Sequence, residues 1–306
     1  YKPDPEDPRI MVRVKPGEKG EYTILGSEGI DNDGDGRFNE DAEGYLDPNR
    51  NFGYHWQPPY VQRGAGNFPF SGIGIKAVDA FAAKHPNIIV NFSFHNSGGM
   101  WLRVPADNTT VLPASDIAAY DVIGKEAIKI TPGYVYMSSF DLYPTFGDSD
   151  GQMFFVHGSY TFVGELFMRE DETYKAKSDK PAAGSDSDRN ERSREQLKFN
   201  DNVVQGELYK EWKPFNHPVY GEIEIGGWVK MSSRLPHPFM LPDLVHRNAS
   251  VVLLAANETP KVEMNVFEVK ELDNNLKRIR VRLKNKNGLS TMTAQAVHDK
   301  LYTVDH

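Results

Sequence analysis

Apolar residues recur at helical spacing along the chain and outline three helices. One face of the first helix carries Ile75, Val78, Phe81 and Ala82. This segment ends before Pro86, since proline lacks the amide hydrogen that a helix needs. Residues 114–130 repeat this spacing. The same reasoning predicts a third helix over residues 241–256.

Two stretches rich in apolar residues predict buried strands. They cover residues 88–94 and 159–167. A helix followed by a buried strand is typical of α/β domains. We therefore expect an α/β fold in which helices flank a mixed central sheet.

The pattern changes to strict alternation after residue 260. Residues 262–266 and 279–283 alternate apolar and polar side chains across a turn at Asp273-Asn274-Asn275, which predicts a hairpin. We expect this hairpin to open a small all-β, sandwich-like C-terminal region. The expected division is a domain over residues 1–257 and a β-rich accessory domain over residues 258–306.

One stretch of the first domain is expected to be mobile. Residues 175–196 are charged, rich in Ser and Asp, and almost free of large apolar side chains. Such a composition buries little apolar surface. It predicts a flexible surface insertion over about residues 170–205.

Composition excludes several classes of function. The chain of 306 residues has a net charge of -8 with no basic stripe, so we expect no nucleic-acid partner. It contains no cysteine, which excludes thiol catalysis and disulfides. No apolar run approaches the roughly 20 residues of a membrane span.

Two ionisable residues stand out in the predicted strands, one at the end of the first and one inside the second. His95 closes the first strand, at the edge where α/β sheets place their sites, and neutral imidazole is a common zinc ligand. Glu165 lies inside the second apolar run, where a carboxylate is costly unless it is paired or protonated. Structural alternatives remain open: a hydrogen-bonded core histidine, and an ion pair of Glu165 with Arg169.

Asn49-Arg50 is a third candidate. A guanidinium beside an amide can hold a carboxylate through paired hydrogen bonds. The same dipeptide is also common on ordinary surfaces.

Taken together, these residues resemble the zinc carboxypeptidase family. The matching segments lie in the family's order over about residues 1–257, interrupted by an insertion near 170–238. They are Asp47-Pro48-Asn49-Arg50-Asn51-Phe52, Gly64-Ala65 to Ser71, Phe94-His95, Leu142-Tyr143 and Gly164-Glu165-Leu166.

The resemblance implies a role for each of these residues. His95 would be a zinc ligand and Glu165 the general base, while Asn49, Arg50 and Tyr143 would hold the terminal carboxylate of a peptide or protein substrate.

The resemblance also implies supporting roles. Asp47 would orient a zinc-binding histidine, and Asp150 falls where the family sets side-chain preference, favouring basic C-terminal residues. An arginine upstream of the Asn-Arg pair would stabilise the oxyanion; Arg13 is the first choice and Arg9 the alternative.

The family's first two zinc ligands lie on a His-x-x-Glu motif that this chain lacks. The chain also begins abruptly at Tyr1, without a signal peptide or initiator Met. We therefore expect an N-terminal segment of the same protein to supply those ligands.

A separate acidic loop suggests calcium. Asp31, Asp33 and Asp35 alternate before Gly36, and Asp41 follows, as in calcium loops of the EF-hand or thrombospondin-repeat type. A solvated acidic turn is the alternative. Calcium binding would favour a secreted or periplasmic location.

The sequence therefore predicts a secreted metallocarboxypeptidase, a zinc-dependent hydrolase that removes C-terminal residues from peptides. The alternatives are an amidase of the same scaffold acting on cell-wall peptides or acylamino acids, and a non-catalytic relative that binds peptide or glycan.

Overall fold

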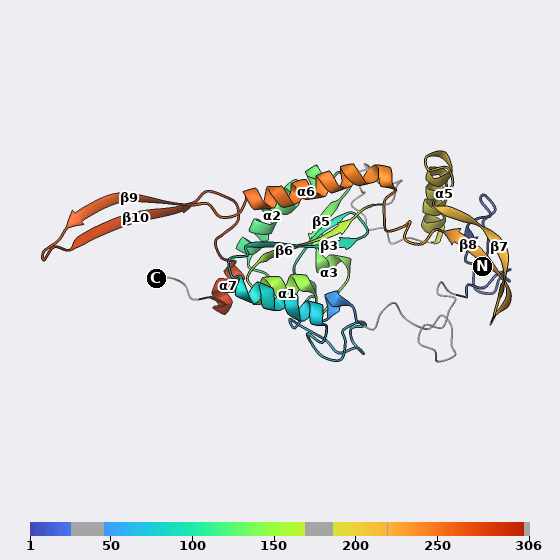
Figure 1. The fold of residues 1–306 in the computed structure, drawn as a ribbon, viewed down its shortest axis with the longest axis horizontal. Helices are drawn as coiled ribbons and strands as arrows, with labels where there is room; N and C mark the ends of the chain where they lie inside the picture. The colour runs from blue at the N-terminus through green and yellow to red at the C-terminus, as the bar shows by residue number, and fades with distance from the viewer. Residues whose placement is uncertain (26–45, 169–185, 219, 303–306) are drawn as a thin grey trace.

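The structure is a computed structural model that describes residues 1–25, 46–168, 186–218 and 220–302. Its centre is an α/β body, with a long two-stranded ribbon at one end and a smaller lobe that contains the N-terminus at the other (Figure 1). The four described ranges exclude the predicted calcium residues Asp31, Asp33, Asp35 and Asp41.

A four-stranded sheet forms the middle of the body. The strands are β3 (Val90–Asn96), β4 (Met100–Arg103), β5 (Val135–Ser138) and β6 (Tyr160–Leu166), in the order β3-β6-β4-β5. β3 runs parallel to β6, whereas β4 runs antiparallel to β6 and parallel to β5. The predicted mixed sheet is confirmed.

Helices cover the sheet on two sides, as the spacing of apolar residues predicts. α2 (Ala114–Ile130) and α6 (Leu241–Asn257) lie together on one side, and α1 (Ile73–Lys84) lies on the other (Figure 1). The main core joins α2 and α6 to aromatic side chains of the sheet, among them Trp101 and Phe162.

Short elements occupy the loops beside the sheet. They are η1 (Pro48–Arg50), α3 (Ser139–Leu142), α4 (Ser149–Gly151), the π-helical turn η2 (Gln152–Val156) and η3 (Pro238–Met240). These turns carry most of the candidate site residues.

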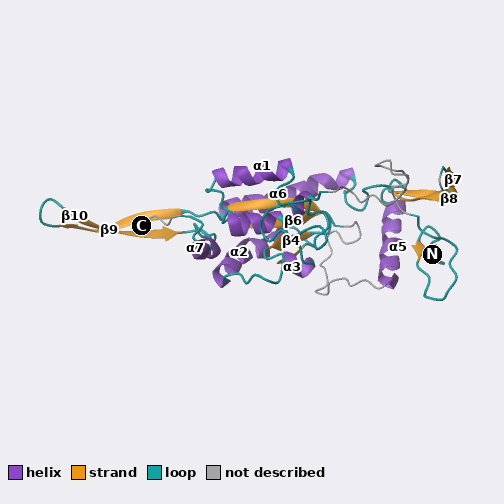
Figure 2. Ribbon diagram, turned by 90° about the horizontal axis from the view of Figure 1, so that it is seen from below, coloured by secondary structure: helices purple, strands orange, loops and turns teal. Residues whose placement is uncertain are grey.

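The smaller lobe combines chain segments that are far apart in sequence. It contains β1 (Lys2–Pro3), β2 (Met11–Val12), α5 (Asp186–Asn202), β7 (Tyr209–His217) and β8 (Gly221–Trp228), and it stands apart from the body in a second view (Figure 2). The insertion predicted over about residues 170–205 contains α5 in its described part, and its flexibility stays a prediction. Leu197 of α5 packs with Ile10, Val12 and Tyr209, so the helix is stabilised by distant partners.

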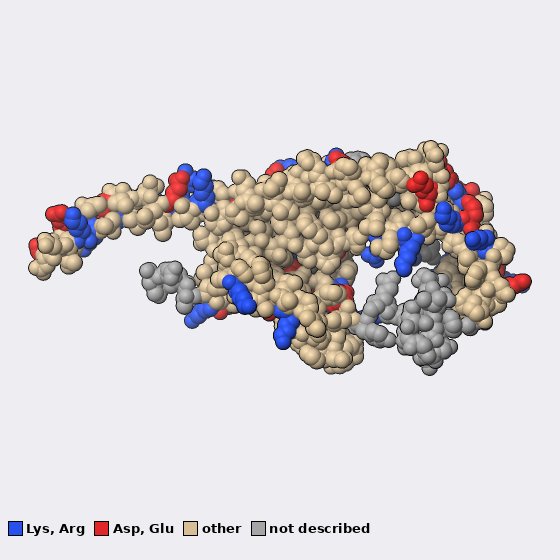
Figure 3. All heavy atoms as spheres, viewed as in Figure 1, with Lys and Arg blue, Asp and Glu red and all other residues tan. Residues whose placement is uncertain are grey.

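The C-terminal region departs from the predicted sandwich. β9 (Val262–Glu271) and β10 (Lys277–Asn285) pair antiparallel, which confirms the hairpin. The ribbon that β9 and β10 form carries both basic and acidic side chains (Figure 3). The chain then returns to the body, where Leu289 joins the main core and α7 (Ala294–Asp299) lies beside α2. The described residues beyond the ribbon therefore add no further strand.

Candidate active site

His95 and Glu165 are direct neighbours across the two parallel strands β3 and β6. Residues in register on adjacent strands point to the same face, so the two side chains share one surface near the carboxyl ends of both strands. Open α/β sheets bind ligands at this end of their strands. The structure therefore brings together the predicted zinc ligand and the predicted general base.

The surroundings of Glu165 and His95 shift the pKa of each group in the direction that favours its neutral form. Partial burial raises the pKa of Glu165, while the positive charges of Arg234 and Arg50 act in the opposite direction. Burial lowers the pKa of His95, opposed by Asp150 and reinforced by Arg50. His95 therefore favours the neutral imidazole at neutral pH, and the Glu165 carboxyl holds its proton to a higher pH than an exposed glutamate does.

Arg50 and Tyr143 meet at the edge of this face. Arg50 lies in η1, and its Nη2 is 3.5 Å from the hydroxyl of Tyr143, the residue that ends α3. Asp47 caps η1 by accepting a hydrogen bond from the amide of Asn49 at 2.8 Å. The turn thus fixes the backbone of the Asn-Arg pair while the Tyr143 side chain stays exposed.

Two serines connect this pair to His95. The amide of Ser149 donates to Asn49 Oδ1 at 2.8 Å, and the Ser149 hydroxyl donates to Ser93 Oγ at 3.1 Å. Ser93 Oγ in turn lies 2.9 Å from His95 Nε2. Asn49 and His95 are therefore linked by an unbroken chain of hydrogen bonds.

Asp150 lies beneath this surface. Its side chain is 2% exposed and accepts a hydrogen bond from the Ser139 hydroxyl at 2.8 Å. Burial and the nearby Asp150 charge raise the pKa of Asp148 well above its ordinary value. Asp150 acts electrostatically on His95, and its predicted contact with a substrate side chain stays a prediction.

The structure does not bring Arg13 or Arg9 to His95 and Glu165. Arg9 forms ion pairs with Asp7 and Asp201 within the smaller lobe. Arg13 follows β2 of the same lobe, and its guanidinium lies 6.0 Å from the ring centre of Tyr1.

The arginine that approaches Glu165 from outside the predicted set is Arg234. It lies between β8 and η3, in a segment whose sequence carries no recognisable motif. Ser93 had a usable signal, because it stands two residues before His95 on a strand and so shares its face. Ser149 had none.

Among the described residues, no group of three or more His, Cys, Asp or Glu side chains is arranged to hold a metal ion. His95 is the one predicted zinc ligand within them. In the tautomer whose Nε2–H donates to Ser93, its Nδ1 keeps a free lone pair, as a metal ligand requires. A complete zinc site needs further donors.

The fold and this pair of strand-end residues define an α/β protein with a histidine-glutamate site. Residues 31–180 match the sequence profile of the zinc carboxypeptidase family. Over this stretch the chain is similar to that family, as its motifs predict.

Further comparisons add little. No curated protein matches the chain. Solved structures that match include thrombin activatable fibrinolysis inhibitor, at 21% identity and a TM-score of 0.37. The match covers 42% of this chain and 35% of that one, so the chain spans about a third of that protein's length. No helix within the described ranges is long and apolar enough to cross a membrane.

Proposed function

We propose that this chain carries the substrate-binding and proton-accepting part of a metallocarboxypeptidase site. The observation that carries the proposal is the pairing of His95 with Glu165 in register, with Arg50 and Tyr143 at the edge of the same site. The family match over residues 31–180 supports hydrolysis of peptides in general.

The carboxylate of a peptide C-terminus would bind at Asn49, Arg50 and Tyr143. Asn49 Oδ1 accepts from the Ser149 amide, which directs the Nδ2 donor away from Ser149. Arg50 uses Nη1 to bond the carbonyl of Asn49 at 2.7 Å and presents its remaining donors near Tyr143. An amide, a guanidinium and a phenol together offer enough donors for both carboxylate oxygens.

Glu165 would accept the proton of the water that attacks the scissile carbonyl. Partial burial raises the pKa of Glu165, which makes its carboxylate a stronger base than that of an exposed glutamate. The positive charges of Arg234 and Arg50 oppose this rise and favour the ionised carboxylate, the form that accepts a proton.

The described residues do not by themselves form a zinc site. They provide His95, and no set of three or more ligand-type side chains accompanies it in the described ranges. The zinc role of His95 is thus part of the proposal, and the steps above use protein groups alone.

An extracytoplasmic location is proposed on the same family relationship, and secretion of the tagged intact protein tests it.

Replacing Glu165 with Gln tests the catalytic proposal. Glu165→Gln keeps the size of the side chain and removes the base, so turnover of a peptide with a free C-terminus should fall about 10²–10⁴-fold. Peptide affinity should change little, because the carboxylate contacts are elsewhere. Turnover equal to that of the unaltered protein would contradict the assigned role.

A non-catalytic peptide-binding protein is the second candidate, because within the described ranges His95 has no companion group of three or more ligand-type side chains. The zinc content of the intact protein separates the two candidates. Bound zinc with turnover supports the enzyme, whereas peptide binding without either supports the second candidate.

A further inference from the structure

The segment around Arg234 is fastened to the end of β3, immediately after His95. Asn96 Nδ2 donates to the carbonyl of Arg234 at 3.2 Å, and Arg234 Nη1 donates to the carbonyl of Asn96 at 2.9 Å. The hydroxyl of Ser97 donates to the carbonyl of Ser233 at 3.3 Å. Three hydrogen bonds thus join this segment to the two residues that follow the candidate zinc ligand.

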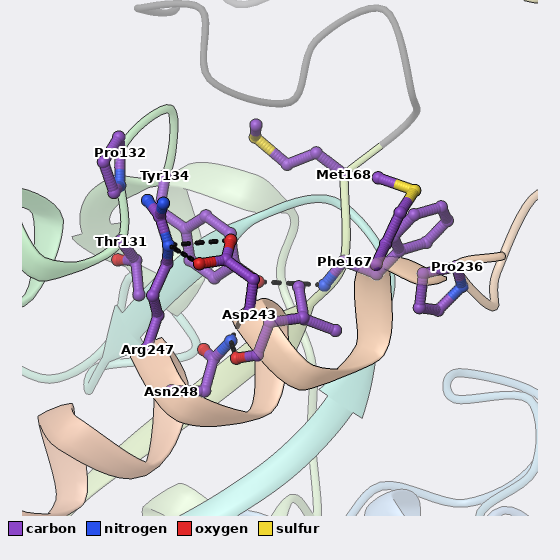
Figure 4. A pocket seen from close by; sticks show the side chains of 11 residues that line it. Thr131, Pro132, Tyr134, Phe167, Met168, Pro236, Asp243, Arg247 and Asn248 are labelled. Atoms are coloured by element: carbon purple, nitrogen blue, oxygen red, sulfur yellow. Dashed lines mark hydrogen bonds and ion pairs between the residues drawn. The ribbon is translucent and has the colours of Figure 1, made fainter. Parts of the chain in front are cut away.

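A second anchor lies two residues further along. Pro236 lines a small pocket together with Phe167 and Met168, the residues that follow β6 and Glu165 (Figure 4). Arg234 is therefore held between the ends of the two strands that carry His95 and Glu165. Its place beside the site follows from packing at both anchors.

Arg234 is a cation without an acidic partner among the residues that the structure describes. Its guanidinium donates to the neutral backbone carbonyl of Asn96, and its side chain is exposed. The carboxyl group that its charge influences is Glu165, which Arg50 also influences. Arg50 also acts on His95 and lies beside Tyr143, whereas Arg234 is hydrogen-bonded to Asn96 at the end of β3.

Because they lie at different places, the two arginines would contact different parts of a substrate. The Arg50 side has the amide and phenol that suit a terminal carboxylate. A substrate held there and extending past Glu165 would place its next residue toward Asn96 and Arg234. An exposed arginine attracts anions and binds carboxylates through paired hydrogen bonds.

We propose that Arg234 binds an acidic side chain on the substrate residue that precedes the scissile bond. The site would then prefer peptides that carry Glu or Asp at the penultimate position. This inference rests on the proposed function, because it takes the terminal carboxylate to lie at Arg50.

The test compares binding of two peptides to the intact protein by calorimetry. The peptides end in the same free carboxylate and differ only in Glu or Gln at the penultimate position. The unaltered protein should bind the Glu peptide about 10- to 100-fold more tightly, as for a hydrogen bond between charged groups. Arg234→Gln should remove this preference and leave the Gln peptide unaffected.

Two further variants sharpen the result. Lys230→Gln removes a positive charge from an exposed position four residues away and should leave the preference intact. Arg234→Lys keeps the charge and should retain part of it. Equal affinity of the unaltered protein for both peptides would overturn the inference, as would an equal loss of both peptides in Arg234→Gln.

Amidated versions of the same peptides separate this inference from the proposed function. Amidation should weaken both peptides if Arg50 holds the terminal carboxylate. If amidation has no effect, the proposed carboxylate site is wrong, and with it the substrate register that the inference requires. If amidation weakens binding but the Glu preference is absent, the inference about Arg234 alone fails.

Discussion

Asp148 is a carboxyl group in an environment that opposes its ionisation. It is buried close to Asp150, although the Gly151 amide and the Thr145 hydroxyl donate hydrogen bonds to it. The folded protein therefore holds the Asp148 proton to a higher pH than the unfolded chain does. Between the ordinary Asp pKa of 3.8 and the raised folded value, the unfolded chain binds fewer protons, so stability falls as pH rises.

Asp148→Asn should remove this pH dependence. The amide keeps an acceptor for Gly151 and can donate to Thr145, so the local turn remains bonded. The free energy of unfolding of the variant should improve relative to the unaltered protein as pH rises from about 4 to 7. Urea denaturation across this range measures the difference, with the exposed Asp273→Asn at the ribbon turn as control. A difference that stays constant with pH would contradict the assignment.

Site residues could be predicted where their chemistry is unusual for their position. A glutamate inside an apolar strand and a histidine at a strand end stand out, and the structure places His95 beside Glu165. Arg234 could not be found this way, because an arginine in an exposed segment is ordinary. Its importance depends on contacts with Asn96, which lies 138 residues away in sequence.

At the scale of elements, two helical glycines have very different surroundings. Gly124 in α2 faces the ring of Tyr136, and a Cβ there would lie 2.3 to 2.5 Å from three ring atoms. Gly74 in α1 has nothing within 4 Å of the same position. Helix propensity favours alanine over glycine by about 1 kcal/mol at an interior position, so packing decides the sign at each site.

Gly124→Ala should destabilise the protein by about 1–3 kcal/mol, because the helix and strand β5 must move apart. Gly74→Ala should stabilise it by about 0.4–1 kcal/mol through the unfolded chain. Urea denaturation of both variants measures the opposite signs. Destabilisation of equal size at both positions would show that packing on Tyr136 is not the cause.

A helix with many buried residues, such as α2, could be predicted from its own sequence, whereas α5, which has few, could not. α2 has six buried residues over its length, which is why its spacing of apolar residues is visible. α5 has Leu197 as its buried apolar anchor, against residues of β2 and β7. One apolar position creates no helical period, so local sequence could not distinguish this helix from an irregular segment.

At the scale of the whole molecule, contacts of the C-terminal residues show where the α/β body ends. Alternation predicts the ribbon correctly, yet the expected boundary near residue 258 does not mark the last contact with the body. Asp116 of α2 accepts hydrogen bonds from the amides of Ala294 and Gln295 at 2.7 and 2.9 Å. The amide of Leu289 donates to the carbonyl of Glu258 at 3.0 Å. These contacts join sequence-distant residues and leave no local pattern.

Two leucines from the C-terminal region test this arrangement. Leu289 is 0% exposed and belongs to the main core, whereas Leu283 lies on the apolar face of the ribbon and is 65% exposed. Leu289→Ala should lower the free energy of unfolding by about 2–5 kcal/mol, because it removes buried methyl groups and leaves a cavity in the core.

Leu283→Ala should change the free energy of unfolding by no more than about 0.5 kcal/mol, as is usual for an exposed position. The decisive probe is the near-ultraviolet signal of the aromatic core around Trp101 and Phe162, which lies in the sheet and far from both leucines in sequence. If residues 286–302 belong to the body, Leu289→Ala shifts the unfolding of that signal. If they formed an independent β domain, the signal would unfold at the same urea concentration in both variants. In that case the C-terminal region would not stabilise the sheet that carries His95 and Glu165.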